Sequence, residues 1–275
     1  MPEGPEIKRA ADKIGKAIGG HIAQRVEFAF EGLQAYECEF ESRKVVAVEP
    51  RGKAILTRFE GTPLRIYSHN QLYGRWVTCK PNRIPKSTRS LRLAIHTAHR
   101  YALLYSASDI EVLHSDTEES EHPYLSKLGP DLLDAAVNAE TVLERLNHSA
   151  FQRRRLGGLY LNQHFLCGPG NYLRSEILFI AGVHPHFRPC DLSPETQYRL
   201  ALASVDITRR AYTERGVTVD KETVAVLKAA GATRRQYRHY VFARGGRSCR
   251  ECGATIQKVS VASRRLYFCP QCQPE

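Results

Sequence analysis

The sequence predicts an α+β chain of several domains, with an N-terminal helix and β-sandwich followed by a helical domain that ends in a cysteine-rich β-hairpin. Three observations support this fold class. Short runs rich in Val, Ile, Tyr and Phe fill residues 22–113, apolar residues recur at helical steps from about 122 to 214, and four cysteines lie in two pairs near the C-terminus. A length of 275 residues is enough for two domains that each bury a core.

A helix is predicted at the start of the chain. Pro5 occupies the tolerated first-turn position, Glu6 suits the helix dipole, and Gly19-Gly20 ends the helix. Such a helix would hold residues 2–6 in place instead of leaving a frayed end. Its apolar face contains Ile7, Ala11, Ile14 and Ile18.

Many short strands separated by Gly, Pro and Asn are typical of a sandwich or barrel. The predicted strands are Val45–Val48, Ala54–Phe59, Leu64–Ser68, Arg75–Thr78, Leu91–Thr97 and Tyr101–Tyr105. Beyond them, helical spacing predicts helices at Val142–Leu146, Phe151–Phe165, Tyr172–Ala181 and Pro194–Tyr212. We interpret residues 215–248 as largely loop, with a short helical piece around Val224–Ala230.

The charge of the chain favours a polyanionic partner. Forty Lys and Arg residues outnumber 29 Asp and Glu residues, a formal net charge of +11. The alternative is a basic surface with no partner. No apolar run approaches the roughly 20 residues of a membrane span, and the N-terminus lacks a signal-peptide layout. We therefore expect no membrane association, and a location in the cytoplasm or, in a bacterium, the nucleoid.

The cysteine pairs Cys249-x2-Cys252 and Cys269-x2-Cys272 are separated by 16 residues and predict one zinc ion. Four thiolates close a tetrahedral site and leave no open position, so the ion would be structural. Two disulfides or free thiols are the alternative. The strands Ile256–Val261 and Leu266–Phe268 would form a hairpin between the pairs, with Arg264-Arg265 at its tip to grip phosphate.

The first residues of the chain carry a potential nucleophile. Proline at position 2 allows the initiator Met1 to be removed, which leaves a secondary amine with a pKa of roughly 7.7–8.0 before perturbation. The unprotonated amine would attack electrophilic carbon, and its imine is an iminium that stays cationic. The alternative is that Met1-Pro2 is an inert way to begin a chain.

Two turns and a lysine are weaker candidates. Gly168-Pro169-Gly170 breaks a helix before Asn171, where backbone N–H groups could bind a phosphate or simply cap a helix. Leu72 and Tyr73 lie in a turn between strands, where they could be core or an apolar wedge that replaces a flipped base. Lys53 begins a strand, where a lysine is usually a solvated charge.

Taken together and in order, these motifs resemble those of the formamidopyrimidine-DNA glycosylase/endonuclease VIII family. The resemblance covers essentially the whole chain and rests on Pro2–Glu6, Arg51-Gly52-Lys53, the Gly-Pro-Gly-Asn turn and the cysteine hairpin. Gly4, Gln71-Leu72-Tyr73 and Ser106-Ala107-Ser108-Asp109 look like the endonuclease VIII branch. The purine-directed branch typically carries Leu in place of Gly4.

The resemblance implies catalytic roles. Pro2 would attack sugar C1′ of a damaged nucleotide, Glu3 would handle protons, and Glu6 would support the pocket. Lys53 would act as a proton donor near the lesion phosphate. Arg264 counts among both the catalytic and the DNA-binding residues. The other DNA-binding residues are Gln71, Leu72 and Tyr73, which would fill the void after base flipping, together with Lys127 and Asn171.

The family further implies the domain plan and the activity. We expect a catalytic β-sandwich domain at 1–115, a linker at 116–133 around the acidic stretch 116–121, a helix–two-turn–helix DNA-binding domain at 134–240 and a zinc finger at 241–275. The expected activity is excision of oxidised pyrimidines such as thymine glycol from double-stranded DNA by a monomer, followed by β,δ-elimination. The alternatives are an oxidised-purine glycosylase, because segment 216–248 is long for the pyrimidine branch, and a zinc-containing DNA-binding protein without activity.

Overall fold

The computed structural model describes residues 2–81, 83–114 and 120–275. These residues form two compact units. The first consists of residue 2 and residues 6–127, and the second of residues 3–5 and 128–275. The boundary at 127/128 falls inside the predicted linker, of which residues 116–119 lie outside the described residues.

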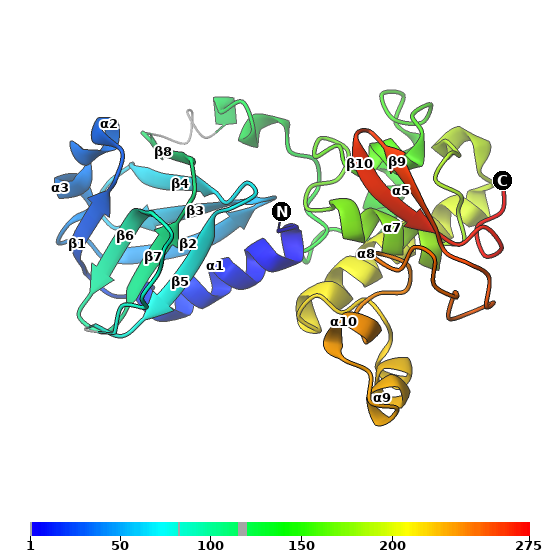
Figure 1. Cartoon of the computed structure of the whole chain (residues 1–275). Helices are drawn as coiled ribbons and strands as arrows, with labels where there is room; N and C mark the ends of the chain where they lie inside the picture. Colours follow the sequence, from blue (N-terminus) through cyan, green and yellow to red (C-terminus); the bar gives the residue numbers. More distant parts are fainter. Residues whose placement is uncertain (1, 82, 115–119) are drawn as a thin grey trace. The chain divides into compact units, whose positions relative to one another are not determined.

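The first unit contains two four-stranded antiparallel sheets (Figure 1). One has the strand order β1-β6-β7-β5 and the other the order β2-β3-β4-β8. The six strands predicted from the sequence are all present, and β1 and β8 are additional. The strands are β1 (Ala23–Phe28), β2 (Val45–Arg51), β3 (Ala54–Phe59), β4 (Arg65–His69), β5 (Arg75–Cys79), β6 (Leu91–Thr97), β7 (Tyr101–Tyr105) and β8 (Asp109–Leu113).

A single apolar core joins both sheets to helix α1 (Gly4–Ile18), which confirms the predicted sandwich with an N-terminal helix. The predicted apolar face of α1 is buried: Ile7, Ala11, Ile14 and Ile18 are each at most 1% exposed. Burial of large apolar side chains stabilises such a helix by about 1.5–3 kcal/mol each. Two short helices, α2 (Glu31–Gln34) and α3 (Glu37–Phe40), follow β1.

The second unit is helical and ends in a β-hairpin. Its main core gathers residues from helices α5 to α8 and from strand β10. The elements after β8 are η1 (Leu125–Lys127), which still belongs to the first unit, α5 (Ala139–Asn147), α6 (Leu156–Leu159), α7 (Asn171–Ile180), η2 (Pro189–Asp191), α8 (Pro194–Thr213), α9 (Lys221–Ala229), α10 (Arg234–Tyr237), β9 (Gln257–Val261) and β10 (Arg264–Phe268). Within the described residues, no helix combines the length and apolar character that a membrane span requires.

The prediction of a helix over Phe151–Phe165 is wrong. Only α6 is helical there, because the backbone N–H groups of Leu156 and Gly157 donate to the carbonyls of Phe187 and Pro185 instead of continuing a helix from residue 151. Paired glycines at 157 and 158 also weaken helix formation by about 1 kcal/mol each.

Segment 215–248 is more ordered than predicted. Helix α9 corresponds to the expected helical piece and begins at an Asp220 cap, whose carboxylate accepts from Thr223 N at 2.7 Å. Helix α10 was not predicted, because it has four residues and no apolar periodicity.

Candidate active site and zinc centre

The carboxylate of Glu3 is held by the N-terminus of α7. Its oxygens accept hydrogen bonds from the backbone N–H groups of Gly170 at 2.8 Å, Tyr172 at 2.8 Å and Leu173 at 3.2 Å. Because the cap residue Gly170 has no side chain, Glu3 supplies the acceptor that a helix start needs. Glu3 is 4% exposed, and the positive end of the helix dipole favours its negative charge.

Two glycines allow the chain start to approach the turn before α7. Gly4 N donates to Gly168 O at 2.9 Å, and a Cβ on Gly4 would lie 2.9 Å from Gly168 Cα. Gly168 itself has a φ of +104°, which an L side chain rarely adopts. Glycine at position 4, noted in the sequence as a branch feature, is therefore a packing requirement of this turn.

Arg174 connects the first residue of α7 to the C-terminal hairpin. Its Nη2 donates to Asn171 Oδ1 at 3.1 Å and to the carbonyls of Arg264 at 3.1 Å and Arg265 at 3.2 Å, and its Nη1 donates to Gly157 O at 2.6 Å. The side chain is fully buried. Burial lowers the Arg174 pKa to about 10, and the Arg264 charge adds to this, while Glu3 opposes it.

Glu176 is a second buried charge on α7 that the sequence reasoning missed. Its carboxylate accepts from the backbone N–H groups of Tyr240 at 2.8 Å, Val241 at 2.9 Å and Phe242 at 2.8 Å, and also from the Thr218 hydroxyl. Burial raises the pKa of Glu176, and these hydrogen bonds act in the opposite direction. A signal was available in the sequence: Arg174 and Glu176 are the two charged residues of a largely apolar helix.

In the first unit, Lys53 directly precedes β3 and is largely buried, at 8% exposed. Its backbone N–H donates to the Tyr124 hydroxyl at 2.8 Å. The pKa of the neighbouring His69 is lowered by burial first and by the Lys53 charge, while Asp109 opposes the shift. Lys53 is therefore a positioned charge and not a solvated one.

Residues 71–73 form the turn between β4 and β5. Leu72 is 59% and Tyr73 is 67% exposed, so neither is a core residue. Gln71 is held by two consecutive residues, because its Oε1 accepts from the Ser108 hydroxyl at 2.8 Å and its Nε2 donates to Asp109 Oδ2 at 3.4 Å. The turn therefore exposes the large side chains of Leu72 and Tyr73 next to Gln71, which is held by hydrogen bonds.

The remaining predicted site residues are more accessible. Pro2 is half-buried, and half-buried Glu6 pairs with Arg9 at 3.1 Å. Lys127, at the end of η1, and Arg264, at the start of β10, are exposed. Within the second unit the structure brings Glu3 to the Gly-Pro-Gly-Asn turn and, through Arg174, Asn171 to the strand of Arg264.

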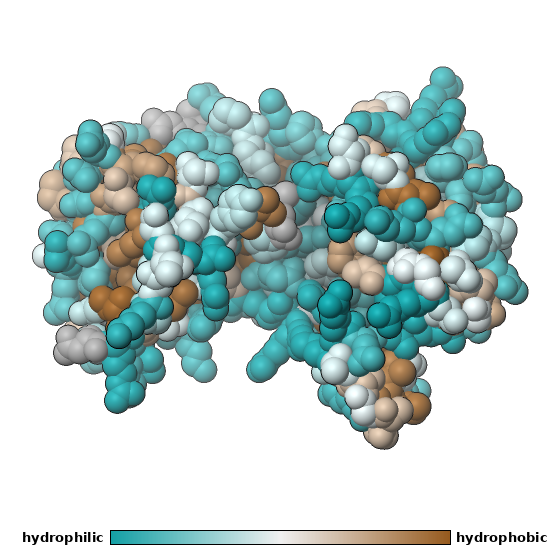
Figure 2. Space-filling model, in the orientation of Figure 1, coloured by the Kyte–Doolittle hydropathy of each residue, from teal (hydrophilic) through white to brown (hydrophobic). Residues whose placement is uncertain are grey.

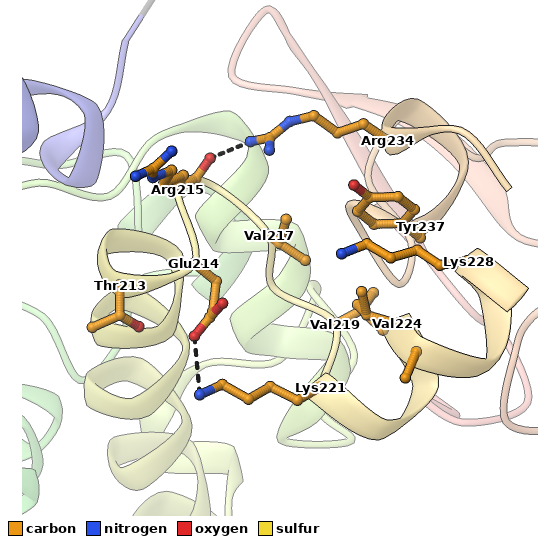
Figure 3. A pocket seen from close by; sticks show the side chains of 11 residues that line it. Thr213, Glu214, Arg215, Val217, Val219, Lys221, Val224, Lys228, Arg234 and Tyr237 are labelled. Carbon is orange, nitrogen blue, oxygen red and sulfur yellow. Dashed lines mark hydrogen bonds and ion pairs between the residues drawn. The ribbon is translucent and has the colours of Figure 1, made fainter.

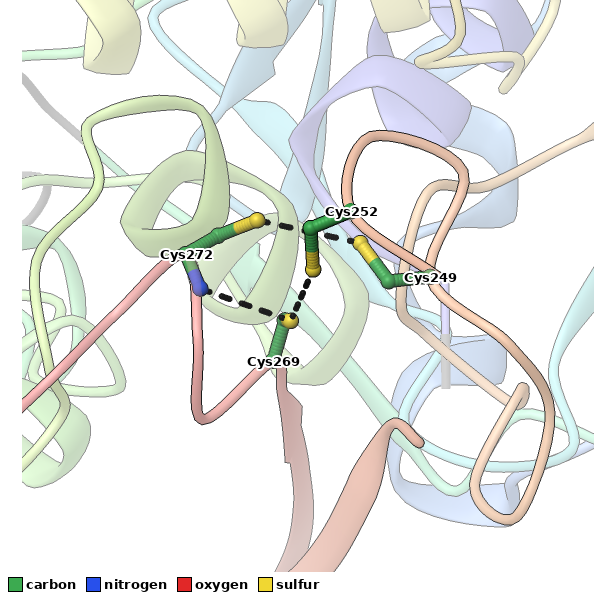
Figure 4. Close-up of side chains that lie close together, drawn as sticks. All are labelled: Cys249, Cys252, Cys269 and Cys272. Carbon is green, nitrogen blue, oxygen red and sulfur yellow. Dashed lines mark hydrogen bonds between the residues drawn. The ribbon is translucent and has the colours of Figure 1, made fainter. Parts of the chain in front are cut away.

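The four predicted metal ligands converge (Figure 4). The Sγ atoms of Cys249 and Cys272 are 3.9 Å apart, those of Cys252 and Cys269 are 3.4 Å apart, and all four lie within 4.8 Å of one another. Thiolates around a tetrahedral zinc ion are separated by about 3.8 Å, given Zn–S bonds of about 2.3 Å. None of these four cysteines forms a disulfide, so the disulfide alternative is not observed.

The cysteine knuckles are tied to the helical core by Gln273. This fully buried amide accepts from Cys269 N at 3.0 Å and donates to Val183 O at 2.8 Å. On the hairpin itself, β9 and β10 pair in register, with Arg264 opposite Val261. The turn residues are therefore Ala262 and Ser263, and Arg264 is the first residue after the tip.

Comparison with known proteins agrees with this architecture. Residues 1–108 match the family model of the formamidopyrimidine-DNA glycosylase N-terminal domain, and residues 248–274 match the zinc finger found in FPG and IleRS. Endonuclease 8 of Pectobacterium atrosepticum is 45% identical over 273 residues, and that of Klebsiella pneumoniae is 43% identical; each alignment covers 99% of this chain and 100% of the relative.

The solved structures show the same fold. Lactococcus lactis Fpg, in complex with DNA containing an N7-benzyl-Fapy-dG, superposes with a TM-score of 0.80 at 21% identity over 100% of both chains. Fold, site and relatives define a DNA-repair enzyme, a DNA glycosylase that is also an abasic-site lyase. Within that class the chain belongs to the formamidopyrimidine-DNA glycosylase/endonuclease VIII family, which confirms the resemblance found in its sequence.

Proposed function

We propose that this chain removes oxidised pyrimidines of the thymine glycol type from double-stranded DNA and then cuts the strand, with the Pro2 amine as nucleophile. The observation that carries the proposal is the anchored Glu3 carboxylate. Its three backbone hydrogen bonds fix an acid/base group at the residue that directly follows the amine. Substrate class is supported by relatives named Endonuclease 8 at 43–45% identity.

The proposed reaction is a substitution at sugar C1′ followed by two eliminations. The Pro2 nitrogen forms a bond to sugar C1′ as the glycosidic bond breaks, and the base leaves with a proton. The sugar ring opens to an iminium, which acidifies the C2′ protons. Loss of one such proton expels the 3′ phosphate, and a second elimination expels the 5′ phosphate. Glu3 carries protons in ring opening and elimination, and Lys53 donates a proton near the lesion phosphate.

DNA would be bound through phosphate contacts and an inserted side chain. Because Arg174 occupies Asn171 Oδ1, the remaining Asn171 amide group is a hydrogen-bond donor suited to a phosphate oxygen. Arg264 and Lys127 would add charge contacts. The exposed Leu72 and Tyr73, supported by Gln71, have the apolar surface needed to occupy the space of a flipped nucleotide.

One structural zinc ion would be held by Cys249, Cys252, Cys269 and Cys272. The sulfur separations and the all-thiol donor set fit zinc, and four protein ligands leave no position for a reacting water. The ion would serve the reaction indirectly, by holding the hairpin that carries Arg264.

The test is borohydride trapping with the processed protein on duplexes that carry thymine glycol or 8-oxoguanine, followed by peptide mapping. We expect an adduct on the N-terminal peptide with thymine glycol and little with 8-oxoguanine. An adduct with 8-oxoguanine alone would assign the chain to oxidised purines. No adduct with either lesion or with an abasic site would leave a DNA-binding protein.

Replacing Gly170 by alanine should slow base excision and, because Glu3 also caps α7, lower the stability by about 1 kcal/mol. The added Cβ would lie 2.5 Å from Glu3 Cδ and 2.7 Å from Oε1, so the carboxylate must move. Displacement of a catalytic group by about 1 Å can cost about 100-fold in rate, which single-turnover excision would measure. Gly158→Ala is the matched control, because a Cβ there meets nothing within 4 Å. Equal single-turnover rates for Gly170→Ala and Gly158→Ala would show that the position of the Glu3 carboxylate does not affect base excision.

A further inference from the structure

A hollow of about 410 Å³ lies in the second unit, away from the Glu3 turn in sequence and built from the end of α8, residues 215–219, α9 and α10 (Figure 3). Its deepest side chains are apolar: Val217 is 6% and Val219 is 1% exposed. Val224 on α9 and the Tyr237 ring on α10 are half-buried and complete the apolar wall. The hollow has room for one large side chain of a ligand.

The rim of the hollow is strongly basic. Arg215, Lys221, Lys228 and Arg234 line it and are exposed. Glu214 is the one acidic residue among the lining residues, and it pairs with Lys221 at 3.3 Å. Three of the four cations therefore remain uncompensated by lining carboxylates. A ligand for this rim must be anionic.

Helix α9 extends the apolar wall to the surface. None of its residues is buried, and Val226 is 69% exposed. Figure 2 shows apolar residues gathered over this lobe, next to a hydrophilic rim. Uncovered apolar surface beside a basic rim is typical of an interaction site.

From these features we propose that the hollow binds an acidic peptide segment of a partner protein, with one large apolar side chain seated on Val217 and Val219. Carboxylates flanking that side chain would meet Arg215, Lys228 and Arg234. The hollow offers an anchor pocket and its basic lining residues offer a charged rim, the two parts that such a peptide needs.

Charge alone would also admit DNA, but the apolar floor favours a peptide. A nucleobase carries several hydrogen-bonding groups along its edge, and the valine side chains on the floor offer none. Burying those groups without partners is costly, whereas an aliphatic or phenyl side chain has no such groups to satisfy.

The test is fluorescence anisotropy of the full-length, zinc-loaded protein with a labelled peptide of consecutive aspartates that ends in phenylalanine. Val224→Asp and Arg234→Glu alter lining residues, and Val46→Asp and Arg235→Glu make the same changes on exposed residues that do not line the hollow. We expect about tenfold weaker binding for each variant of the first pair and less than about twofold for the second. Replacing the peptide's phenylalanine by alanine should also weaken binding about tenfold.

Folding of each variant is checked by its melting temperature. On the unchanged protein, a peptide with a photoreactive phenylalanine should label residues between Thr213 and Tyr237. The proposal would be overturned if the lining and control variants lost the same peptide affinity. It would also be overturned if the alanine peptide bound as tightly as the phenylalanine peptide, or if the label appeared outside residues 213–237. The proposal would also fail if the peptide did not bind and a single-stranded oligonucleotide bound more weakly only to Val224→Asp and Arg234→Glu. That result would assign the hollow to nucleic acid.

Discussion

Protein that retains Met1 should form no borohydride-stable adduct with an abasic-site duplex, while protein that begins at Pro2 should be trapped quantitatively. With Met1 attached, the Pro2 nitrogen is part of a peptide bond, and its lone pair is delocalised into the carbonyl. An amide nitrogen is not a nucleophile toward sugar carbon, so the entire covalent pathway is lost. The measurement is adduct formation by gel shift, with mass spectrometry of the N-terminal peptide.

Two controls make this result specific. Pro2→Gly in processed protein replaces the secondary amine by a primary amine, and we expect trapping to survive with altered kinetics. DNA affinity of the Met1 form should remain measurable, which would separate lost chemistry from lost binding. If the Met1 form gave an adduct that mapped to Lys53, that lysine and not Pro2 would be the nucleophile.

Removal of the metal should unfold the C-terminal hairpin. Structural zinc in finger peptides contributes about 10–16 kcal/mol of apparent binding free energy, which is comparable to or larger than the 5–15 kcal/mol stability of a typical domain. The core around the cluster contains the ligands Cys249 and Cys269 themselves, together with Phe179, Val241 and Tyr267, so loss of the ion would disturb its packing directly. We therefore expect chelation or Cys269→Ser to lower the melting temperature and to weaken duplex binding at least tenfold, with one zinc per chain lost by elemental analysis.

Cys190→Ser is the matched control, because Cys190 is an exposed free thiol outside the cluster. It should keep the zinc content, melting temperature and DNA affinity of the unchanged protein. If the chelated protein melted at the same temperature as the zinc-loaded one, the cysteine cluster would not be a structural metal centre.

The elements that sequence predicted well are those fixed by local patterns. Helix α1 has an opening proline, an apolar face and a closing Gly19-Gly20 pair, and the strands are bounded by turn residues. The cysteine spacing predicted the cluster for the same reason, because each knuckle is a local structure. Helix Phe151–Phe165 failed because its N–H groups bond to residues 185–187, a competition that helical periodicity does not report.

In the candidate site, too, features set by local sequence were predicted and features set by distant contacts were not. The identity of Glu3 was predicted, but its anchoring was not, because its partners are 167 or more residues away along the chain. Arg174 and Glu176 were missed because their partners are distant along the chain, in strand β10 for Arg174 and in residues 240–242 for Glu176. Leu72 and Tyr73 stayed ambiguous between core and wedge, because exposure depends on what packs against a turn.

The buried Arg174 also has a consequence for how the proposed phosphate contacts of Asn171 and Arg264 could evolve. One guanidinium bonds to Asn171 and to the carbonyls of Arg264 and Arg265, so the two proposed phosphate ligands share a rigid support before any DNA arrives. DNA binding then loses little entropy in fixing Asn171 relative to the backbone of Arg264. The same sharing makes their substitutions non-additive, since a change at position 174 would alter both contacts together. We expect a substitution at position 174 to be tolerated only together with compensating changes at the start of β10.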